Sequence, residues 1–220
     1  MSLLTVSEAA ERLVVSSRQV QNLVASGKLR QVARGMLDET SVERHMAVRG
    51  GSHKRAWSEA TAWGAVALLS GGGAEWMGES QRSRLKGRLR ELNAAGLAER
   101  TRERADVTRY AAHSSTGDRL LGELVYATNV ADRLGLAATN SVDGYLAAGD
   151  VTAVVSRHGL IRDDEGRITV RATSTNLVIV RDLMQRSVVL AALDLAESLD
   201  VRERRAGLDA LDSALEAFRG

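Results

Sequence analysis

The chain begins with two short amphipathic segments, which are separated by a break at Val14-Val15. These segments limit the folds that this part of the chain can adopt. Residues 5–13 and 16–26 both place apolar side chains three and four positions apart, which predicts helices with one buried face each. Ser7 is an N-cap or first-turn residue of the first helix, and Gly27 is a typical stop for the second. The apolar faces are Val6, Ala9, Ala10 and Leu13, then Val20, Leu23 and Val24. Two helices joined by so short a break predict a helix-turn-helix.

The second of these helices carries polar side chains suited to reading DNA bases. In a helix-turn-helix the second helix enters the major groove, where Arg pairs with guanine and Gln or Asn with adenine. Ser16 and Ser17 provide its N-cap, and their hydroxyls are suited to phosphate. The candidate base-reading residues are Arg18, Gln19, Gln21 and Asn22.

Residues 28–37 alternate around a glycine and predict a small hairpin, or wing. Lys28, Arg30 and Arg34 are then expected to reach the DNA backbone or the minor groove. Residues 38–48 predict a closing helix whose inward side chains are Val42, His45 and Met46.

The stretch LLTVSEAAERLVVSSRQVQNLVASGKL resembles the excisionase-type, MerR-like winged helix-turn-helix. The resemblance implies a DNA-binding domain over residues 1–50. Two positions depart from the family pattern: Val14 stands where Gly is usual, and the wing is poorer in Arg and lacks the Pro that normally follows it. The alternative is a generic pair of helices in an all-α core. The matching residues are Leu4, Thr5, Glu8, Ala9, Ala10, Leu13, Val15, Ser16, Val20, Gly27 and Leu29.

Residues 51–113 predict a second winged-helix-like domain. A helix over 57–69 with a Ser58 cap precedes a glycine-rich break, and a helix over 79–92 follows it. Residues 97–101 and 107–111 are expected to pair as a hairpin, so the segment resembles winged helices in general. The second helix buries Leu85, Leu89 and Leu92 and presents five candidate phosphate-binding residues, Arg82, Arg84, Lys86, Arg88 and Arg90. The alternative is a solvated helix whose arginines pair with local acids.

Residues 114–220 predict a helical interaction domain with one hairpin. Helices are expected from 116 or 117 to 136, then over 142–148, 150–158, 177–184, 187–199 and 201–218. Residues 161–171 predict the hairpin, with a turn at 163–166 and with Thr169 and Arg171 alternating with apolar residues. The expected fold class is mainly α with small β-hairpins (α+β): tandem winged helix-turn-helix units plus a helical α/β C-terminal domain.

The formal net charge of +2 conceals a gradient along the chain. Residues 1–113 hold 18 basic and 12 acidic residues, whereas residues 114–220 hold 12 basic and 16 acidic residues. A basic half joined to an acidic half indicates two partners of opposite character, unless the gradient arose by chance.

Signals of catalysis and of metal or cofactor binding are weak. The absence of Cys excludes disulfides, Cys-ligated zinc and thiol catalysis. Residues 73–80 have the spacing of a P-loop, but Glu79 stands where Lys is needed, and Ser83 and Lys86 lack companion motifs. The four His residues show no ligand spacing, and the acids at 163–165 lack the calcium-loop pattern. We expect no enzyme activity, no cofactor and no metal; a cytoplasmic protein is expected because no signal peptide or membrane span is recognised.

The whole layout resembles the antitoxins of type IV toxin–antitoxin systems, with VVLAALDLAESLDVRERRAGLDAL as the most distinctive C-terminal stretch. The resemblance implies an autoregulating transcriptional repressor that binds double-stranded DNA at promoter or operator repeats, and a nucleotidyltransferase-like toxin as its partner. The alternatives are an excisionase-type recombination directionality factor, an antitoxin that acts mainly by direct protein binding, and an enzyme with a cryptic site.

Overall fold

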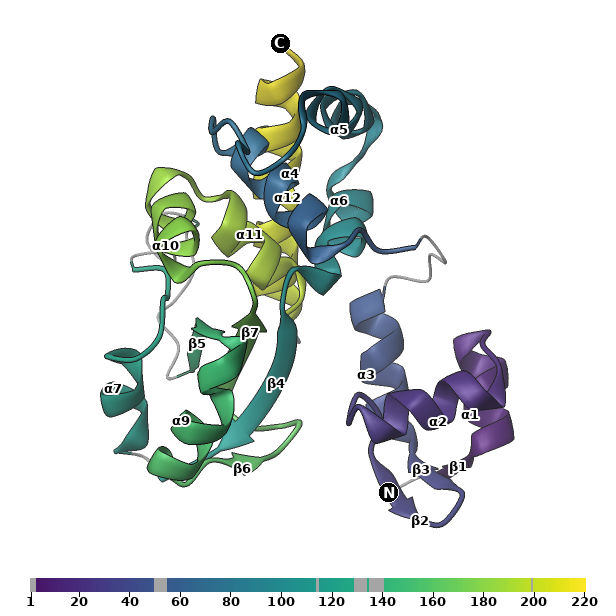
Figure 1. The fold of residues 1–220 in the computed structure, drawn as a ribbon. Helices are drawn as coiled ribbons and strands as arrows, with labels where there is room; N and C mark the ends of the chain where they lie inside the picture. The colour runs from purple at the N-terminus through teal and green to yellow at the C-terminus, as the bar shows by residue number, and fades with distance from the viewer. Residues whose placement is uncertain (1–2, 50–54, 114, 129–133, 135–140, 199) are drawn as a thin grey trace. The chain divides into compact units, whose positions relative to one another are not determined.

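The chain forms two compact units, Met1–His53 and Lys54–Gly220, which we call unit 1 and unit 2 (Figure 1). The computed structural model describes residues 3–49, 55–113, 115–128, 134, 141–198 and 200–220. The predicted boundary between 51–113 and 114–220 lies inside unit 2, because a strand from the first segment is paired with strands from the second. Among the described residues, no helix combines the length and hydropathy that a membrane crossing needs.

Unit 1 contains three helices and a three-stranded antiparallel sheet in its described part. The helices are α1 (Val6–Leu13), α2 (Ser17–Ala25) and α3 (Glu39–Arg49). The strands β1 (Leu3–Thr5), β2 (Gln31–Ala33) and β3 (Met36–Asp38) have the order β1-β3-β2. The hairpin predicted at 28–37 is present as β2 and β3, with Gly35 at φ 76° in its turn.

Local hydrogen bonds explain where α1 and α2 begin. Thr5, not Ser7, is the N-cap of α1: the Thr5 hydroxyl accepts from the Glu8 amide, and the Glu8 carboxylate accepts from the Thr5 amide. The Thr5 amide and then the Thr5 hydroxyl donate to the Glu8 carboxylate, and these two hydrogen bonds hold the pKa of Glu8 below its ordinary value. Ser16 caps α2 by accepting from the Gln19 amide at 3.2 Å.

The core of unit 1 is built from the apolar faces that the sequence predicts. Val42 of α3 is fully buried as expected, but Met46 is 41% exposed, so its predicted inward position is wrong. Met46 lies four residues beyond Val42, close to the end of α3, where the small core no longer covers it. The buried residues are Leu4, Ala9, Ala10, Leu13, Val20, Leu23, Leu29, Leu37 and Val42.

Unit 2 combines a helical layer with a four-stranded sheet (Figure 1). Trp63 lies fully buried in the largest core, which joins the helical layer to Tyr145 of the sheet. The layer consists of α4 (Glu59–Leu69), α5 (Glu79–Glu91), α6 (Ala94–Thr101), the 3-10 turn η1 (Arg102–Arg104), α10 (Leu177–Arg186), α11 (Val189–Ala196) and α12 (Val201–Arg219). The helices predicted over 177–184, 187–199 and 201–218 are thus present with shifted ends.

The sheet of unit 2 has the strand order β5-β7-β4-β6. Its strands are β4 (Asp106–Ala111), β5 (Val142–Ala147), β6 (Ile161–Arg162) and β7 (Ile168–Thr173). β5 runs parallel to β7, whereas β4 is antiparallel to both β7 and β6. The connection from β5 to β7 includes η2 (Ala148–Asp150) and α9 (Val151–His158). Together with α7 (Thr116–Leu121), α9 covers an apolar core that includes Tyr110, Leu146 and Val170.

Three sequence predictions in unit 2 are wrong, and long-range contacts explain two of them. Residues 97–101 belong to a helix, α6, because Asn93 caps it by accepting from the Gly96 amide at 2.9 Å and Leu97 is buried. Residues 142–147 form strand β5 and not a helix, because β7 supplies a full parallel partner. Residues 161–171 are not a hairpin, because β4 lies between β6 and β7. A Cβ at Gly166 would lie 2.1 Å from the Tyr110 carbonyl oxygen, so only glycine permits this approach to β4.

Two further helix predictions have mixed outcomes. The helix expected from 116 or 117 to 136 ends at Leu121, and Val125 pairs with Tyr145 instead. Of the residues predicted to continue that helix to 136, residues 129–133, 135 and 136 lie outside the described residues. The helix expected over 150–158 is confirmed as α9, and the turn at 163–166 is confirmed by a hydrogen bond from the Gly166 amide to the Asp163 carbonyl.

Val14 is held in a conformation that disfavours β-branched residues. It ends α1 in the left-handed region, at φ 53° and ψ 48°, with 68% of its surface exposed. We predict that Val14→Gly stabilises unit 1 by about 1 kcal/mol, because glycine adopts this conformation without steric cost and little packing is lost.

Amide hydrogen exchange of α1 and α2 measures this effect, because unit 1 contains no Trp, Tyr or Phe to report its unfolding by fluorescence. Val15→Gly is the matched control: Val15 packs against the core, so its loss should lower protection. Lower protection in Val14→Gly would contradict the prediction.

Candidate nucleic-acid interface

The predicted base-reading side chains all lie on the exposed surface of α2. Val20 and Leu23 are buried and fix which face of α2 turns inward. Arg18 and Asn22 are four residues apart and Gln21 is three residues beyond Arg18, so these three share the outer face. Gln19 is also exposed, toward one side of that face. α2 therefore presents one cation and three amide side chains together.

The N-terminus of α2 adds groups suited to an anion. Ser17 is exposed, and Ser16 uses an oxygen lone pair to cap the helix, which leaves its hydroxyl hydrogen able to donate. The first turn of α2 contains no acidic residue. The positive end of the helix dipole and these hydroxyls favour phosphate at this end.

The β2–β3 hairpin carries the remaining predicted contacts of unit 1. Lys28, Arg30 and Arg34 are exposed, and every residue of β2 is exposed as well. The backbone of Arg30 is fixed, since its amide donates to the Ser41 hydroxyl and its carbonyl accepts from the Asp38 amide. Within the described residues, neither Arg18 nor these three cations forms an ion pair.

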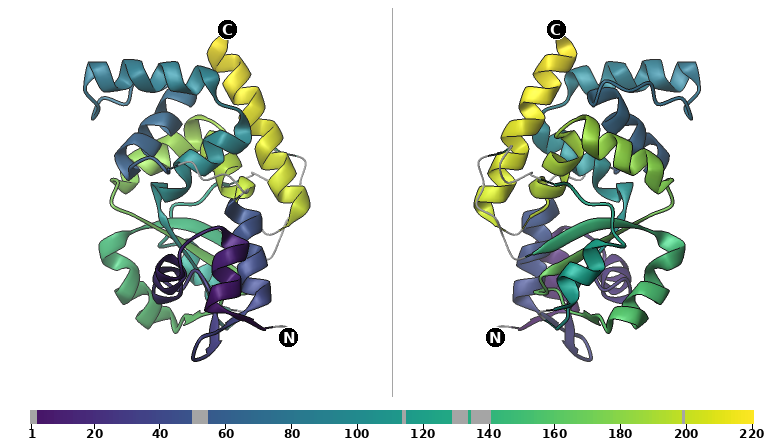
Figure 2. Two further views of the ribbon diagram at one scale, coloured as in Figure 1. Left: turned by 90° about the vertical axis from the view of Figure 1, so that its right-hand side faces the viewer. Right: turned by 90° about the vertical axis from the view of Figure 1, so that its left-hand side faces the viewer.

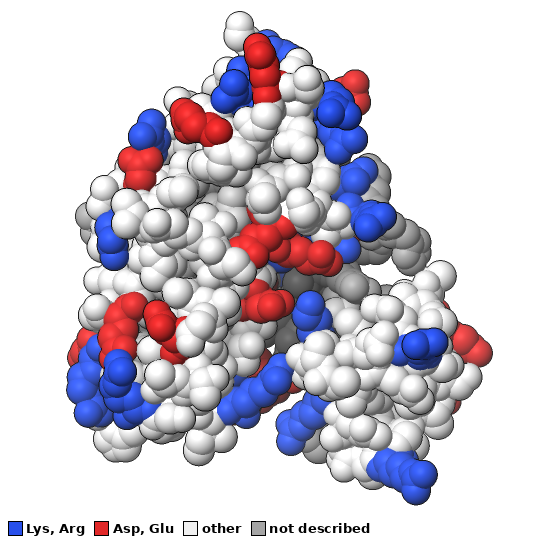
Figure 3. Space-filling model, viewed as in Figure 1, with Lys and Arg blue, Asp and Glu red and all other residues white. Residues whose placement is uncertain are grey.

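The predicted cations of α5 are presented in a similar way. Leu85 and Leu89 are buried, whereas Arg84, Lys86, Arg88 and Arg90 are exposed. Arg82 is half-buried and donates to the Gly73 carbonyl at 3.1 Å, which limits its reach. In the described part of the chain, none of the five pairs with an acid, so the alternative of arginines neutralised by local acids finds no support there. Basic side chains gather where α5 lies (Figure 3).

The C-terminal helix α12 holds α5 in place. Arg219 donates from Nε to the Arg90 carbonyl at 3.0 Å and from Nη2 to the Leu92 carbonyl, so it caps the carboxyl end of α5. The guanidinium of Arg90 lies 5.8 Å from the centre of the Phe218 ring, a cation–π distance. Asp212 accepts from the Ala94 amide at the start of α6.

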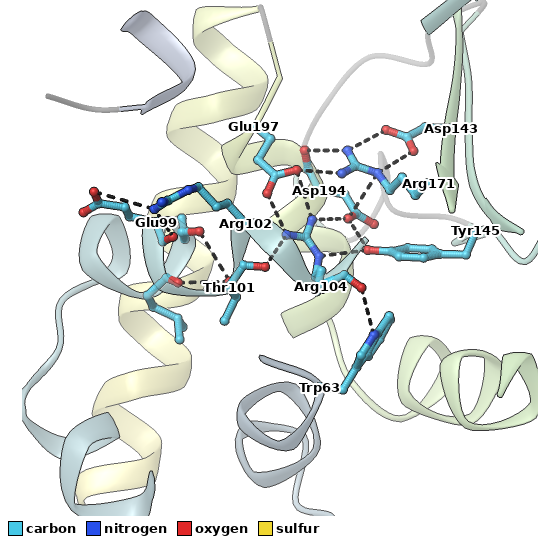
Figure 4. Close-up of polar contacts among 12 residues, drawn as sticks. Trp63, Glu99, Thr101, Arg102, Arg104, Asp143, Tyr145, Arg171, Asp194 and Glu197 are labelled. Atoms are coloured by element: carbon cyan, nitrogen blue, oxygen red, sulfur yellow. Dashed lines mark hydrogen bonds and ion pairs between the residues drawn. The ribbon is translucent and has the colours of Figure 1, made fainter. Parts of the chain in front are cut away.

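A buried ionic network joins the helical layer of unit 2 to its sheet (Figure 4). Arg104 lies 2.6 Å from Asp194 and 2.6 Å from Glu197, with only 1% of its side chain exposed. Arg171 of β7 lies 2.6 Å from Glu197 and 2.7 Å from Asp143, with 3% exposed. Both guanidinium groups are therefore paired on more than one side, as burial of a charge requires.

Neutral groups complete the network. The Tyr145 hydroxyl donates to Asp194 at 2.6 Å and accepts from Nε of Arg104 at 3.0 Å. The Trp63 indole N–H lies 3.0 Å from the Arg104 carbonyl and 3.1 Å from the Thr173 hydroxyl. The Trp63 and Tyr145 rings meet edge to face at 5.5 Å.

The two buried acids of the network titrate in opposite directions. Desolvation raises the pKa of Asp194 above its ordinary value. Glu197 is desolvated too, but the guanidiniums of Arg104 and Arg171 outweigh burial and lower its pKa. Burial raises the pKa of the Tyr145 hydroxyl, which therefore remains a neutral donor.

Sequence reasoning missed this network entirely. The hairpin predicted over 97–111 places Arg104 at its tip, but Arg104 lies in η1 and is buried against Trp63, Asp194 and Glu197. Arg171 is buried because β7 is an inner strand of the sheet. The available signal was Asp194 and Glu197, which interrupt the apolar sequence of α11 and its end. Among the described residues, no group of three or more His, Cys, Asp or Glu is arranged to hold a metal.

Comparisons with known proteins identify no relative: no family model, no curated protein and no solved structure matches the chain.

We predict that Arg104→Met destabilises unit 2 by about 3–5 kcal/mol, because it leaves Asp194 and Glu197 buried without one of their cations. Tyr145→Phe should cost about 1–3 kcal/mol through the lost hydroxyl. Urea unfolding followed by Trp fluorescence measures both, since all three Trp residues lie in unit 2. The control is Arg186→Met, which removes an exposed pair with Asp182 and should leave the unfolding midpoint almost unchanged.

The depressed pKa of Glu197 predicts a pH-dependent contribution to stability. Its stabilisation is fully present above the unfolded-state value of 4.5 and is lost as the pH falls through the lower folded-state pKa. The difference in unfolding free energy between the wild type and Glu197→Gln should therefore be larger at pH 7 than below pH 4.5. A difference that is constant across this range would contradict the assignment.

Proposed function

We propose that the protein is a sequence-specific transcriptional regulator that binds double-stranded DNA. One observation carries the proposal: Arg18, Gln19, Gln21 and Asn22 are exposed together on α2, and Arg18 has no ion-pair partner in the described part of the chain. Arg pairs with guanine and Gln or Asn with adenine in the major groove. The short turn before α2 and the hairpin after it support this use of α2.

In this proposal the remaining predicted residues position the protein on the DNA backbone. Ser16 and Ser17 bind phosphate at the start of α2, and Lys28, Arg30 and Arg34 bind phosphate or the minor groove. The cations of α5, from Arg82 to Arg90, bind mainly phosphates and add salt-dependent affinity.

A role as the antitoxin of a type IV toxin–antitoxin system remains a more specific proposal, supported by the resemblance of the sequence. It predicts that a nucleotidyltransferase-like toxin is encoded by the adjacent gene. Co-expression of that gene product with the full chain tests it: rescue of growth supports the antitoxin role. An adjacent integrase gene would favour the excisionase-type alternative.

We predict that Arg18→Ala weakens binding to the preferred duplex by about 1–3 kcal/mol and reduces discrimination at one base pair. Arg84→Ala should instead weaken binding to all sequences alike and reduce the salt dependence. Fluorescence anisotropy measures both effects, with duplexes that tile the DNA upstream of the coding sequence and with duplexes of random sequence.

The matched control is Arg205→Ala, which removes the same charge from an exposed site on α12. Its effect on either class of duplex should be small. Equal losses on preferred and random duplexes for Arg18→Ala would contradict the base-reading role of α2.

A further inference from the structure

The cations of α5 are arranged in a way that lowers the stability of the helix. Arg82–Lys86, Arg84–Arg88 and Lys86–Arg90 are like-charge pairs four residues apart, and such pairs destabilise a helix. The acids of α5, Glu79 and Glu91, are its first and last residues. Figure 2 shows α5 at the outer edge of unit 2, so an anionic partner can approach it.

The exposed cations of α5 form two rows on either side of a strip of small residues. Leu85 and Leu89 define the buried face. Because an α-helix has 3.6 residues per turn, Arg84 and Arg88 lie on one flank and Lys86 and Arg90 lie on the other. The strip farthest from the core consists of Ser80, Ser83 and Gly87, and Glu91 continues it at the carboxyl end of α5; all four are exposed.

Gly87 has no intramolecular reason to be glycine. A Cβ added at this position would meet nothing within 4 Å, and its φ is not positive. Glycine inside a helix makes the helix less stable than alanine does, so Gly87 lowers the stability of α5. What glycine does provide is a close approach of the helix backbone to a partner.

We propose that α5 lies lengthwise in the major groove of duplex DNA, with the Ser80–Ser83–Gly87 strip toward the bases and the two rows of cations on the phosphates of opposite walls. This inference rests on the proposed function, because it gives the same DNA a second contact surface, located in unit 2. The major groove is about 12 Å wide and a helix with its side chains is about 10–12 Å across.

The chemistry of α5 makes this second contact tolerant of sequence. Its cations reach phosphates, which carry no base information, and its strip offers the bases serine hydroxyls, with the Glu91 carboxylate only at the carboxyl end of the helix. Because α2 and α5 belong to one chain, binding of either surface raises the local concentration of DNA at the other. Unit 1 thus supplies specificity, and unit 2 supplies affinity.

The first experiment separates the two surfaces in the full chain. A variant with Arg18, Gln19, Gln21 and Asn22 replaced by Ala should lose its preference for upstream over random duplex yet keep salt-dependent binding to both. Adding Arg84→Gln, Lys86→Gln and Arg88→Gln should reduce the slope of log affinity against log salt by about 3, since each phosphate contact contributes about 0.9. The control replaces Arg167, Arg202 and Arg205 by Gln, with the same change in net charge, and should leave the slope unchanged.

The second experiment tests the position in the groove independently of charge. Gly87→Leu keeps every cation, has room within unit 2, and should raise the thermal midpoint because leucine favours the helix. It should nevertheless weaken duplex binding at least tenfold, whereas Ala153→Leu on α9 should not. Gly87→Ala should give a smaller loss in the same direction.

The outcomes separate the two proposals. Undiminished duplex binding by Gly87→Leu, or an unchanged salt slope after the three α5 replacements, overturns the groove position of α5 and leaves the role of α2 intact. If the variant with four α2 residues replaced by Ala retains the wild-type preference for upstream duplex, the proposed function is wrong. The contribution of α5 is then still measured by the slope of log affinity against log salt on random duplex.

Discussion

Two guanidinium groups buried among three carboxylates determine how unit 2 is assembled. Arg104 follows α6 and precedes β4, Arg171 lies in β7, and their acids come from β5 and from α11 and its end. Apolar packing is not directional, whereas these hydrogen bonds are satisfied only when the helical layer and the sheet meet in one arrangement. We regard fixing that arrangement as the role of the network, because a buried ion pair is weak evidence for net stability. Within that helical layer, α5 packs against α4 and α12 and is capped by Arg219.

Local patterns in the sequence predicted the elements that local forces determine. The helices of unit 1, the β2–β3 hairpin and helices α10 to α12 follow from apolar spacing, caps and turn residues within each segment. The errors occur where a distant partner decides the structure. The residues of β5 acquire their conformation from β7, and β6 and β7 are separated by a strand from more than 50 residues earlier. Residues 97–101 are helical for a local reason, because Asn93 caps α6 by accepting from the Gly96 amide.

The candidate interface was more predictable than the buried network. Arg18, Gln21 and Asn22 fall outside the apolar face of α2, so periodicity alone placed them on the surface. Periodicity does not identify Arg171 as buried, however. Strand β7 is buried on both faces, so the alternation of apolar and polar residues does not show which side chains face solvent. Asp194 in α11 and Glu197 at its end were the local sign of buried cations.

The residues that stabilise the fold differ from those that carry the proposed function. The network and the cores use buried groups, whereas α2, the hairpin and α5 present cations and amides that have no ion-pair partner among the described residues. The central claim is that the exposed side chains of α2 read the bases of duplex DNA. Selection from a randomised duplex library by the full chain, followed by sequencing, tests it most directly. The account predicts enrichment of a short motif containing guanine and adenine at adjacent positions; a retained pool with the same composition as the starting library would contradict it.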